Sequence, residues 1–109
     1  MAAELGLRHG DFATITTMRA IVEARVLVTG RLKPVRVAGR TVHQVGLPYH
    51  FGTNGLVKGD VVNDLLPISE EPNVRIMETK ALLCDVRPGR RPTGKQALEE
   101  LKAKREQAA

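Results

Sequence analysis

The residues best suited to binding a polar ligand gather in one glycine-rich stretch of the 109-residue chain, residues 46–63. It carries Tyr49, His50 and Phe51 among glycines and ends on Asn63. Glycines let a backbone approach a ligand closely, and flat side chains pack against planar groups. An asparagine amide can read the donor–acceptor edge of a heterocycle. The stretch therefore predicts a loop that contacts a planar polar ligand; the alternative is a connection whose aromatic rings fold back onto the protein.

No arrangement typical of a catalytic or metal site accompanies this loop. Ser69 is the only serine and lacks the surroundings of a strained nucleophile turn. Cys84, the only cysteine, lies in an apolar run, so we expect a small buried side chain. The three histidines, His9, His43 and His50, are not spaced as metal ligands on one element. We therefore predict no catalytic residue and no metal ligand in this chain.

The formal net charge of +5 raises the question of a nucleic-acid partner. Residues 1–86 carry 10 basic against 9 acidic side chains, whereas residues 87–109 carry 7 against 3. Duplex-binding proteins normally carry basic charge on their folded face, because phosphate contacts dominate affinity. Aromatic residues amount to only 3%, too few for a surface that stacks bases. A small basic β-barrel that binds nucleic acid through its C-terminal tail is thus the alternative function, which we do not expect.

Short strands are the elements that must position the loop. β-Branched residues and the alternation of Glu23 and Arg25 with apolar neighbours predict a strand pair joined by a turn at residues 17–20. A further turn is expected at residues 38–40, and a short helix over residues 60–66 would start with Asp60 as N-cap. A helical turn is expected within residues 2–7. The expected strands are residues 12–17, 21–29, 34–37, 41–45 and 80–86.

The C-terminal segment divides into a linker and a helix. Residues 87–93 contain Pro88, Gly89 and Pro92, which predict a linker that leaves the helix mobile. Residues 94–107 carry a narrow apolar stripe typical of a helix. No apolar run approaches the ~20 residues that cross a bilayer, and residues 1–10 have no signal-peptide core. We therefore expect a cytoplasmic protein that does not contact a membrane.

Motifs in a fixed order give the chain a resemblance to a known family. The segments LGLRHGD (5–11) and TGRLKP (29–34), with the turn at residues 17–19, resemble the C-terminal molybdopterin dinucleotide-binding domain of molybdenum and tungsten oxidoreductases. Three further segments narrow the similarity to the large (alpha) subunit of formate dehydrogenase: VHQVGLPYHFG (42–52), GDVVNDL (59–65) and KALLC (80–84). The similarity covers about residues 3–86.

The resemblance implies a mainly β fold, the double-psi β-barrel shared with aspartate decarboxylase. Because relatives have a strand ahead of residues 2–5, we expect the barrel to lack its first strand and to be followed by the C-terminal helix. The implied domains are a cofactor-binding barrel at residues 1–86, the linker at 87–93 and the helix at 94–107. The decarboxylase activity known for this barrel type is excluded, because self-cleavage needs a Gly-Ser pair that the chain lacks.

The family's cofactor is bis(molybdopterin guanine dinucleotide), which the whole enzyme binds. The resemblance implies contacts to it from residues that match the family's motifs: Thr17, Arg19, His50, Phe51, Gly52, Asn63 and Lys80. The family's metal-ligating and catalytic residues belong to domains that precede this one. We therefore expect an isolated chain that holds no cofactor, does not oxidise formate, and has the remaining domains or subunits of a formate dehydrogenase as partners.

Overall fold

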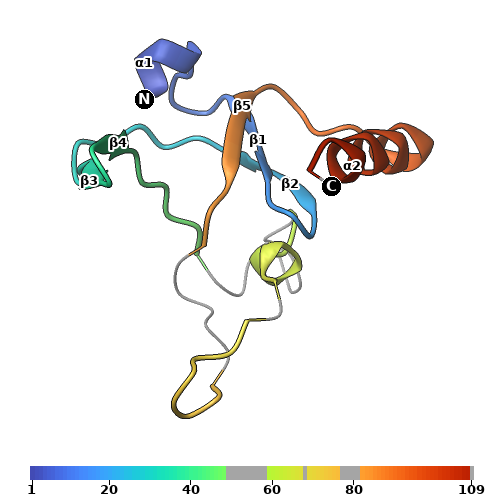
Figure 1. The fold of residues 1–109 in the computed structure, drawn as a ribbon. Helices are drawn as coiled ribbons and strands as arrows, with labels where there is room; N and C mark the ends of the chain where they lie inside the picture. The colour runs from blue at the N-terminus through green and yellow to red at the C-terminus, as the bar shows by residue number, and fades with distance from the viewer. Residues whose placement is uncertain (49–58, 68, 77–81, 109) are drawn as a thin grey trace.

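The structure, a computed structural model, describes residues 1–48, 59–67, 69–76 and 82–108. Its centre is a three-stranded antiparallel sheet in the order β2-β1-β5 (Figure 1). The strands are β1 (Phe12–Thr16), β2 (Ile21–Arg25) and β5 (Asp85–Pro88). β1 joins segments that are far apart in the sequence, because Ile15 lies opposite both Val22 and Val86.

The hairpin of β1 and β2 forms where its β-branched residues and its alternating pattern predict it. The turn between the strands is closed by a hydrogen bond from Thr17 N to Ala20 O at 3.0 Å. β2 ends at Arg25, short of the predicted residue 29. Beyond Arg25 the regular ladder ends because the partner segment forms a tight turn, in which Asp11 N donates to Arg8 O. Val26 is still bonded to that turn, since its N–H donates to Asp11 O and its O accepts from Gly10 N, both at 2.8 Å.

The last strand is displaced from its predicted position. The apolar run predicted a strand over residues 80–86, but the ladder with β1 is formed by Asp85–Pro88. Pairing with β1 decides where β5 lies, and residues 82–84 have no ladder partner within the described part of the chain. Cys84 is exposed, so the prediction that it is buried is wrong.

A second, two-stranded hairpin lies to one side of the sheet and consists of β3 (Val35–Val37) and β4 (Arg40–Val42) (Figure 1). Its two turn residues have positive φ, 50° at Ala38 and 77° at Gly39, as a tight hairpin with two connecting residues requires. The predicted turn is confirmed at Ala38 and Gly39, whereas Arg40, also expected in it, already pairs with Val37 as the first residue of β4. Of the strand predicted over residues 41–45, Thr41 and Val42 belong to β4, and His43 lies exposed beyond its end.

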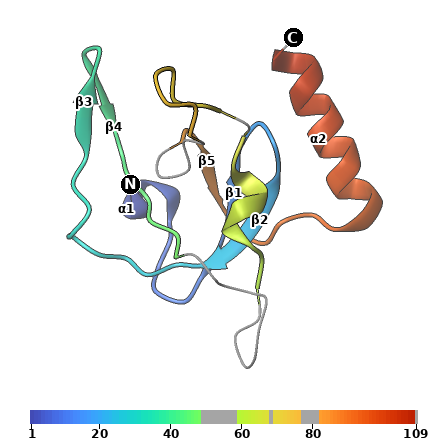
Figure 2. The same cartoon turned by 90° about the horizontal axis from the view of Figure 1, so that it is seen from below.

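Three helical segments are described: α1 (Ala2–Leu5), the 3-10 helix η1 (Val62–Leu65) and α2 (Gly94–Ala108). η1 packs against β2, and α2 lies on the opposite side of the sheet from the β3–β4 hairpin (Figures 1 and 2). All three fall where a helix is predicted. None of the described helices combines the length and apolarity that a bilayer crossing needs.

The hydrophobic core is small and lies where η1 meets the hairpin. Ile15, Val22 and Leu65 form its centre, with 5%, 4% and 2% of their surface exposed. The chain exposes 8786 Å² in all, whereas a compact monomer of this mass exposes about 6,000 Å². Beside the core lies a groove of about 1360 Å³, and its lining includes Leu32, Leu47 and Val86.

The mainly β character with one long C-terminal helix is confirmed. Within the described residues the sheet ends at β2 on one side and at β5 on the other. Closure into a double-psi β-barrel, with or without a first strand, stays a prediction.

The small core makes stability sensitive to its one fully buried leucine. We predict that Leu65→Ala lowers the free energy of unfolding by about 2–4 kcal/mol, because truncation leaves a cavity between η1 and the sheet. Urea unfolding followed by circular dichroism measures the loss. Leu27→Ala is the control, since Leu27 is 78% exposed and should change stability by less than about 0.5 kcal/mol. Equal losses in the two variants would show that Leu65 is not part of a packed core.

Candidate functional site

The turn that joins β1 to β2 is attached to η1 by two side chains that the sequence singled out. Thr17 Oγ1 donates to Leu65 O at 2.8 Å and accepts from Arg19 N at 3.2 Å. Arg19 Nη1 donates to Leu66 O at 2.8 Å. Thr17 is buried, and its hydroxyl is occupied by these backbone groups. The pair therefore fixes the position of η1 relative to the turn.

Asn63 lies within η1, three residues before the carbonyl that Arg19 binds. Its backbone O accepts from Leu66 N at 3.2 Å, and its side chain is exposed. The structure thus brings three of the seven expected site residues together at one end of the β1–β2 hairpin: Thr17, Arg19 and Asn63. The other four expected site residues lie outside the described residues: His50, Phe51, Gly52 and Lys80.

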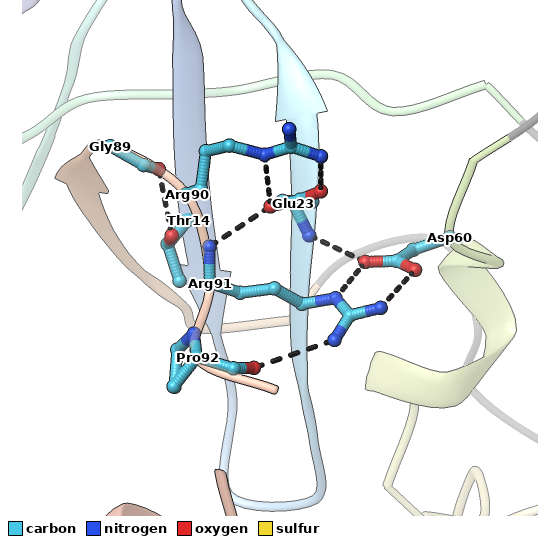
Figure 3. A network of polar contacts seen from close by, with 7 residues as sticks. All are labelled: Thr14, Glu23, Asp60, Gly89, Arg90, Arg91 and Pro92. Carbon is cyan, nitrogen blue, oxygen red and sulfur yellow. Dashed lines mark hydrogen bonds and ion pairs between the residues drawn. The ribbon is translucent and has the colours of Figure 1, made fainter. Parts of the chain in front are cut away.

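A polar network beside η1 was not foreseen from the sequence (Figure 3). Arg91 forms a bidentate ion pair with Asp60, in which Nε donates to Oδ2 at 2.6 Å and Nη2 donates to Oδ1 at 3.0 Å. The same carboxylate accepts the backbone N–H of Glu23 at 2.8 Å. Glu23 in turn binds the Arg90 guanidinium at 2.7 and 3.3 Å and the backbone N–H of Arg91 at 3.0 Å. Two carboxylates and two arginines so connect β2, the approach to η1 and the residues after β5.

Gly89 directs the two arginines toward the network. Its φ of 99° is a conformation that other residues rarely adopt, and it turns the chain immediately after β5. Gly89 N donates to Phe12 O at 2.9 Å, and Gly89 O accepts from the hydroxyl of fully buried Thr14, also at 2.9 Å. The residues predicted to form a free linker are therefore hydrogen-bonded to β1 and β2. Arg87 adds an ion pair of 2.9 Å to Glu100 on α2.

Asp60 does not serve as the predicted helix N-cap. The N-cap of η1 is Val61, and no side chain caps this end. The carboxylate instead covers the outer edge of β2 through Glu23 N, because an unpaired strand N–H needs an acceptor and Arg91 compensates the charge. A sequence window around residue 60 could not reveal a partner 31 residues away.

The arginines hold both carboxylates in the ionised form. Hydrogen bonding to Arg90 is the main reason why the pKa of Glu23 is lowered, and the N–H of Arg91 acts in the same direction. Burial of Asp60 favours the protonated acid, but the hydrogen bonds from Arg91 and from Glu23 N outweigh it, so the pKa of Asp60 is also lowered. The pKa of exposed Cys84 is raised by partial desolvation and by Asp85, which makes the thiol a poor nucleophile. These groups position the chain and do not suit acid–base or nucleophilic chemistry.

Phe12 gives the network an apolar boundary. The guanidinium carbons of Arg25 and Arg90 lie 4.3 and 4.2 Å from the centre of its ring, within cation–π range. Within residues 1–48, 59–67, 69–76 and 82–108, no group of three or more His, Cys, Asp or Glu side chains converges on a metal position. The described site can therefore offer hydrogen-bond donors and a fixed backbone to a ligand, but no metal-ligand set.

Comparison with known proteins gives this geometry a context. Over 87 residues, 80% of the chain, it is 39% identical to formate dehydrogenase 2 subunit alpha (cytochrome c-553) of Nitratidesulfovibrio vulgaris. It is 37% identical over 90 residues, 79% of the chain, to formate dehydrogenase subunit alpha of Megalodesulfovibrio gigas. The nitrate-inducible formate dehydrogenase major subunit of Escherichia coli is 38% identical over 87 residues, again 79% of the chain. The chain is related to formate dehydrogenase large subunits.

The relation to formate dehydrogenase covers a small part of these long subunits. The chain spans 9% of the length of each of the three relatives. No protein-family model matches the chain. The similarity therefore relates most of this chain to one segment of a formate dehydrogenase large subunit, and the activity of the whole relatives is a matter for proposal.

The network predicts a stability that falls in acid. Because the folded-state pKa values of Asp60 and Glu23 are lowered, their ionised forms stabilise the fold above the ordinary carboxyl pKa. We expect the free energy of unfolding to fall as the pH is lowered from about 5 to about 3, through the ordinary carboxyl range and toward the folded pKa values. Urea unfolding at a series of pH values measures this slope.

The double variant Glu23→Gln with Asp60→Asn should flatten that slope. Some slope will persist through Glu71, whose pKa is lowered by hydrogen bonds from Val74 N and Asn73 N. Glu4→Gln removes an exposed carboxylate outside the network and serves as the control. A double variant with the same acid slope as the control would contradict the assignment of these two carboxylates.

Proposed function

We propose that this chain is a cofactor-binding segment of a formate dehydrogenase large subunit and adopts the double-psi β-barrel of that family. It would contribute contacts to the pterin and nucleotide of a molybdopterin guanine dinucleotide and have no catalytic activity alone. The observation that carries the proposal is the similarity of 37–39% identity, over about four fifths of the chain, to three formate dehydrogenase large subunits. The cofactor supplies the redox chemistry when bound, and the chain's residues hold and orient it.

The described site residues fit such a group. Arg19 is exposed and uses one guanidinium nitrogen on Leu66 O, which fixes the side chain beside η1. Asn63 is exposed on the same helix. A guanidinium and an amide at one hairpin end suit a ligand that combines phosphates with a heterocyclic edge. Within the proposal Thr17 positions the turn rather than touching the ligand, because its hydroxyl is already bonded to Leu65 O.

The surface of the chain supports a place within a larger assembly. A groove of about 1360 Å³ lies beside the small core, and much of its lining is apolar. Leu27, Val28 and Leu32, which line it, are 78%, 37% and 46% exposed, and apolar side chains exposed side by side favour a face that other protein covers. We propose the remaining domains or subunits of a formate dehydrogenase as that cover. In this proposal residues 1–86 belong to the cofactor-binding domain, residues 87–93, which begin within β5, connect it to the C-terminal helix, and residues 94–107 form that helix. The expected cytoplasmic location is part of the same proposal.

Ion pairs within the chain neutralise part of the basic charge on which the nucleic-acid alternative depends. Three of the seven basic residues after residue 86 form ion pairs within the chain: Arg87 with Glu100, Arg90 with Glu23 and Arg91 with Asp60. Phosphate binding would have to compete with these carboxylates. Binding to duplex DNA that falls steeply with salt and disappears on removal of residues 94–109 would favour the alternative.

Cofactor content of the whole large subunit tests the proposal. In a large subunit that carries this segment, we predict that Asn63→Ala and Arg19→Ala each lower the guanine nucleotide released per polypeptide several-fold. Asn73→Ala is the matched control, since Asn73 is exposed and bonded only locally to Glu71 among described residues. Nucleotide is measured by chromatography after denaturation, and molybdenum or tungsten by elemental analysis. Full cofactor content in both variants would refute the assigned contacts.

A further inference from the structure

A second pocket lies between the sheet and α2, on the face opposite the β3–β4 hairpin. It has a volume of about 300 Å³, and its lining includes Thr16, Met18, Leu83 and Leu101. It is therefore built from the β1–β2 turn, the chain just before β5, and the C-terminal half of α2. Arg19, on the same turn, is directed to η1 instead, because it donates to Leu66 O.

Apolar side chains at this pocket are left in solvent. Met18 is 85% exposed and Leu83 is 87% exposed, the highest values among the large apolar residues of the described chain. Leu101 of α2 is only partly covered. Exposure of these two side chains to water is unfavourable, and a partner that covered them would gain that free energy.

The rim of the pocket is basic. Lys104 and Arg105 stand on the last turns of α2, and Asp85 provides the one acidic lining residue. Neither basic residue forms an ion pair with another described residue. The rim therefore has a net positive charge and complements an acidic partner.

One polar group in the wall lacks a hydrogen bond. Thr16 is 5% exposed, and its Oγ1 has no hydrogen-bond partner within the described part of the chain. A buried hydroxyl without a partner is destabilising, because its desolvation is not compensated. This oxygen is itself buried, so it does not add a contact at the surface of the pocket.

We propose that the pocket beside α2 docks an acidic peptide segment of another protein, with an apolar side chain inserted between Met18, Leu83 and Leu101 and with carboxylates at Lys104 and Arg105. A second copy of this chain is the poorer occupant, because each copy carries a net charge of +5 and the copies repel. The inference does not require the proposed cofactor contacts, although the pocket shares the β1–β2 turn with Thr17 and Arg19.

Synthetic peptides test the proposal on the full chain, labelled with ¹⁵N. The probe is the hexapeptide Glu-Glu-Leu-Phe-Glu-Glu with blocked ends. One comparison peptide replaces every Glu by Lys, and another replaces Leu-Phe by Ser-Ser. We expect saturable amide shifts at Met18, Leu83 and Leu101 with the first peptide, and binding at least about tenfold weaker with each of the other two.

Matched variants separate a specific site from general attraction. Leu83→Ser and Lys104→Glu should each weaken binding several-fold. Two control variants should leave binding unchanged: Leu27→Ser, which alters another highly exposed leucine in the other groove, and Lys95→Glu, at the start of the same helix. Thermal unfolding of each variant confirms that the fold is retained. Equal binding of the acidic and basic peptides, or equal effects of test and control variants, would overturn the proposal, as would concentration-dependent shifts at these amides without peptide.

Discussion

The described fold depends most on the hydrogen bonds and the ion pair that the carboxylate of Asp60 accepts. One oxygen accepts the backbone N–H of Glu23 at the outer edge of β2, and both receive the guanidinium of Arg91. Three segments that are distant in sequence thereby meet at one side chain: β2, the approach to η1 and the residues after β5. η1, which packs against β2 and is also held by Thr17, carries Asn63 to the end of the hairpin.

Ion pairs and charged hydrogen bonds matter for the stability of this fold because few apolar side chains are buried. Only six apolar residues are buried in the described chain, and the core centre consists of Ile15, Val22 and Leu65. Partly buried ion pairs repay their desolvation only when each charge is well satisfied. Here each carboxylate accepts at least three hydrogen bonds from arginines and backbone N–H groups. A segment stabilised in this way, with a wide apolar groove on its surface, fits its relation to much longer subunits.

Local patterns predicted the hairpin of β1 and β2, the turn at Gly39 and the positions of the helices, because each depends on neighbours within a few residues. The relation to formate dehydrogenase large subunits was likewise readable from ordered motifs. The pairing of residues far apart in the sequence could not be predicted from local patterns. β5 lies where β1 offers partners rather than where the apolar run is strongest, and Cys84 is exposed as a result. Arg90, the partner of Glu23, lies 67 residues further along the chain, and Arg91, the partner of Asp60, lies 31 residues further along. In the sequence the two acidic residues therefore look like ordinary surface charges. An acidic residue on a strand and an adjacent Arg-Arg pair were the only hints.

Amide hydrogen exchange in the Asp60→Asn variant tests most directly whether this carboxylate organises the site. The account predicts that two amide protons lose protection together: that of Glu23, which donates to Asp60, and that of Leu66, which closes η1 on Asn63 O. The amide of Gly89, bonded to Phe12 O on β1, should keep its protection and show that the sheet is intact. Unchanged exchange at Leu66 while Glu23 becomes unprotected would show that η1 is held independently of Asp60, and would contradict the account.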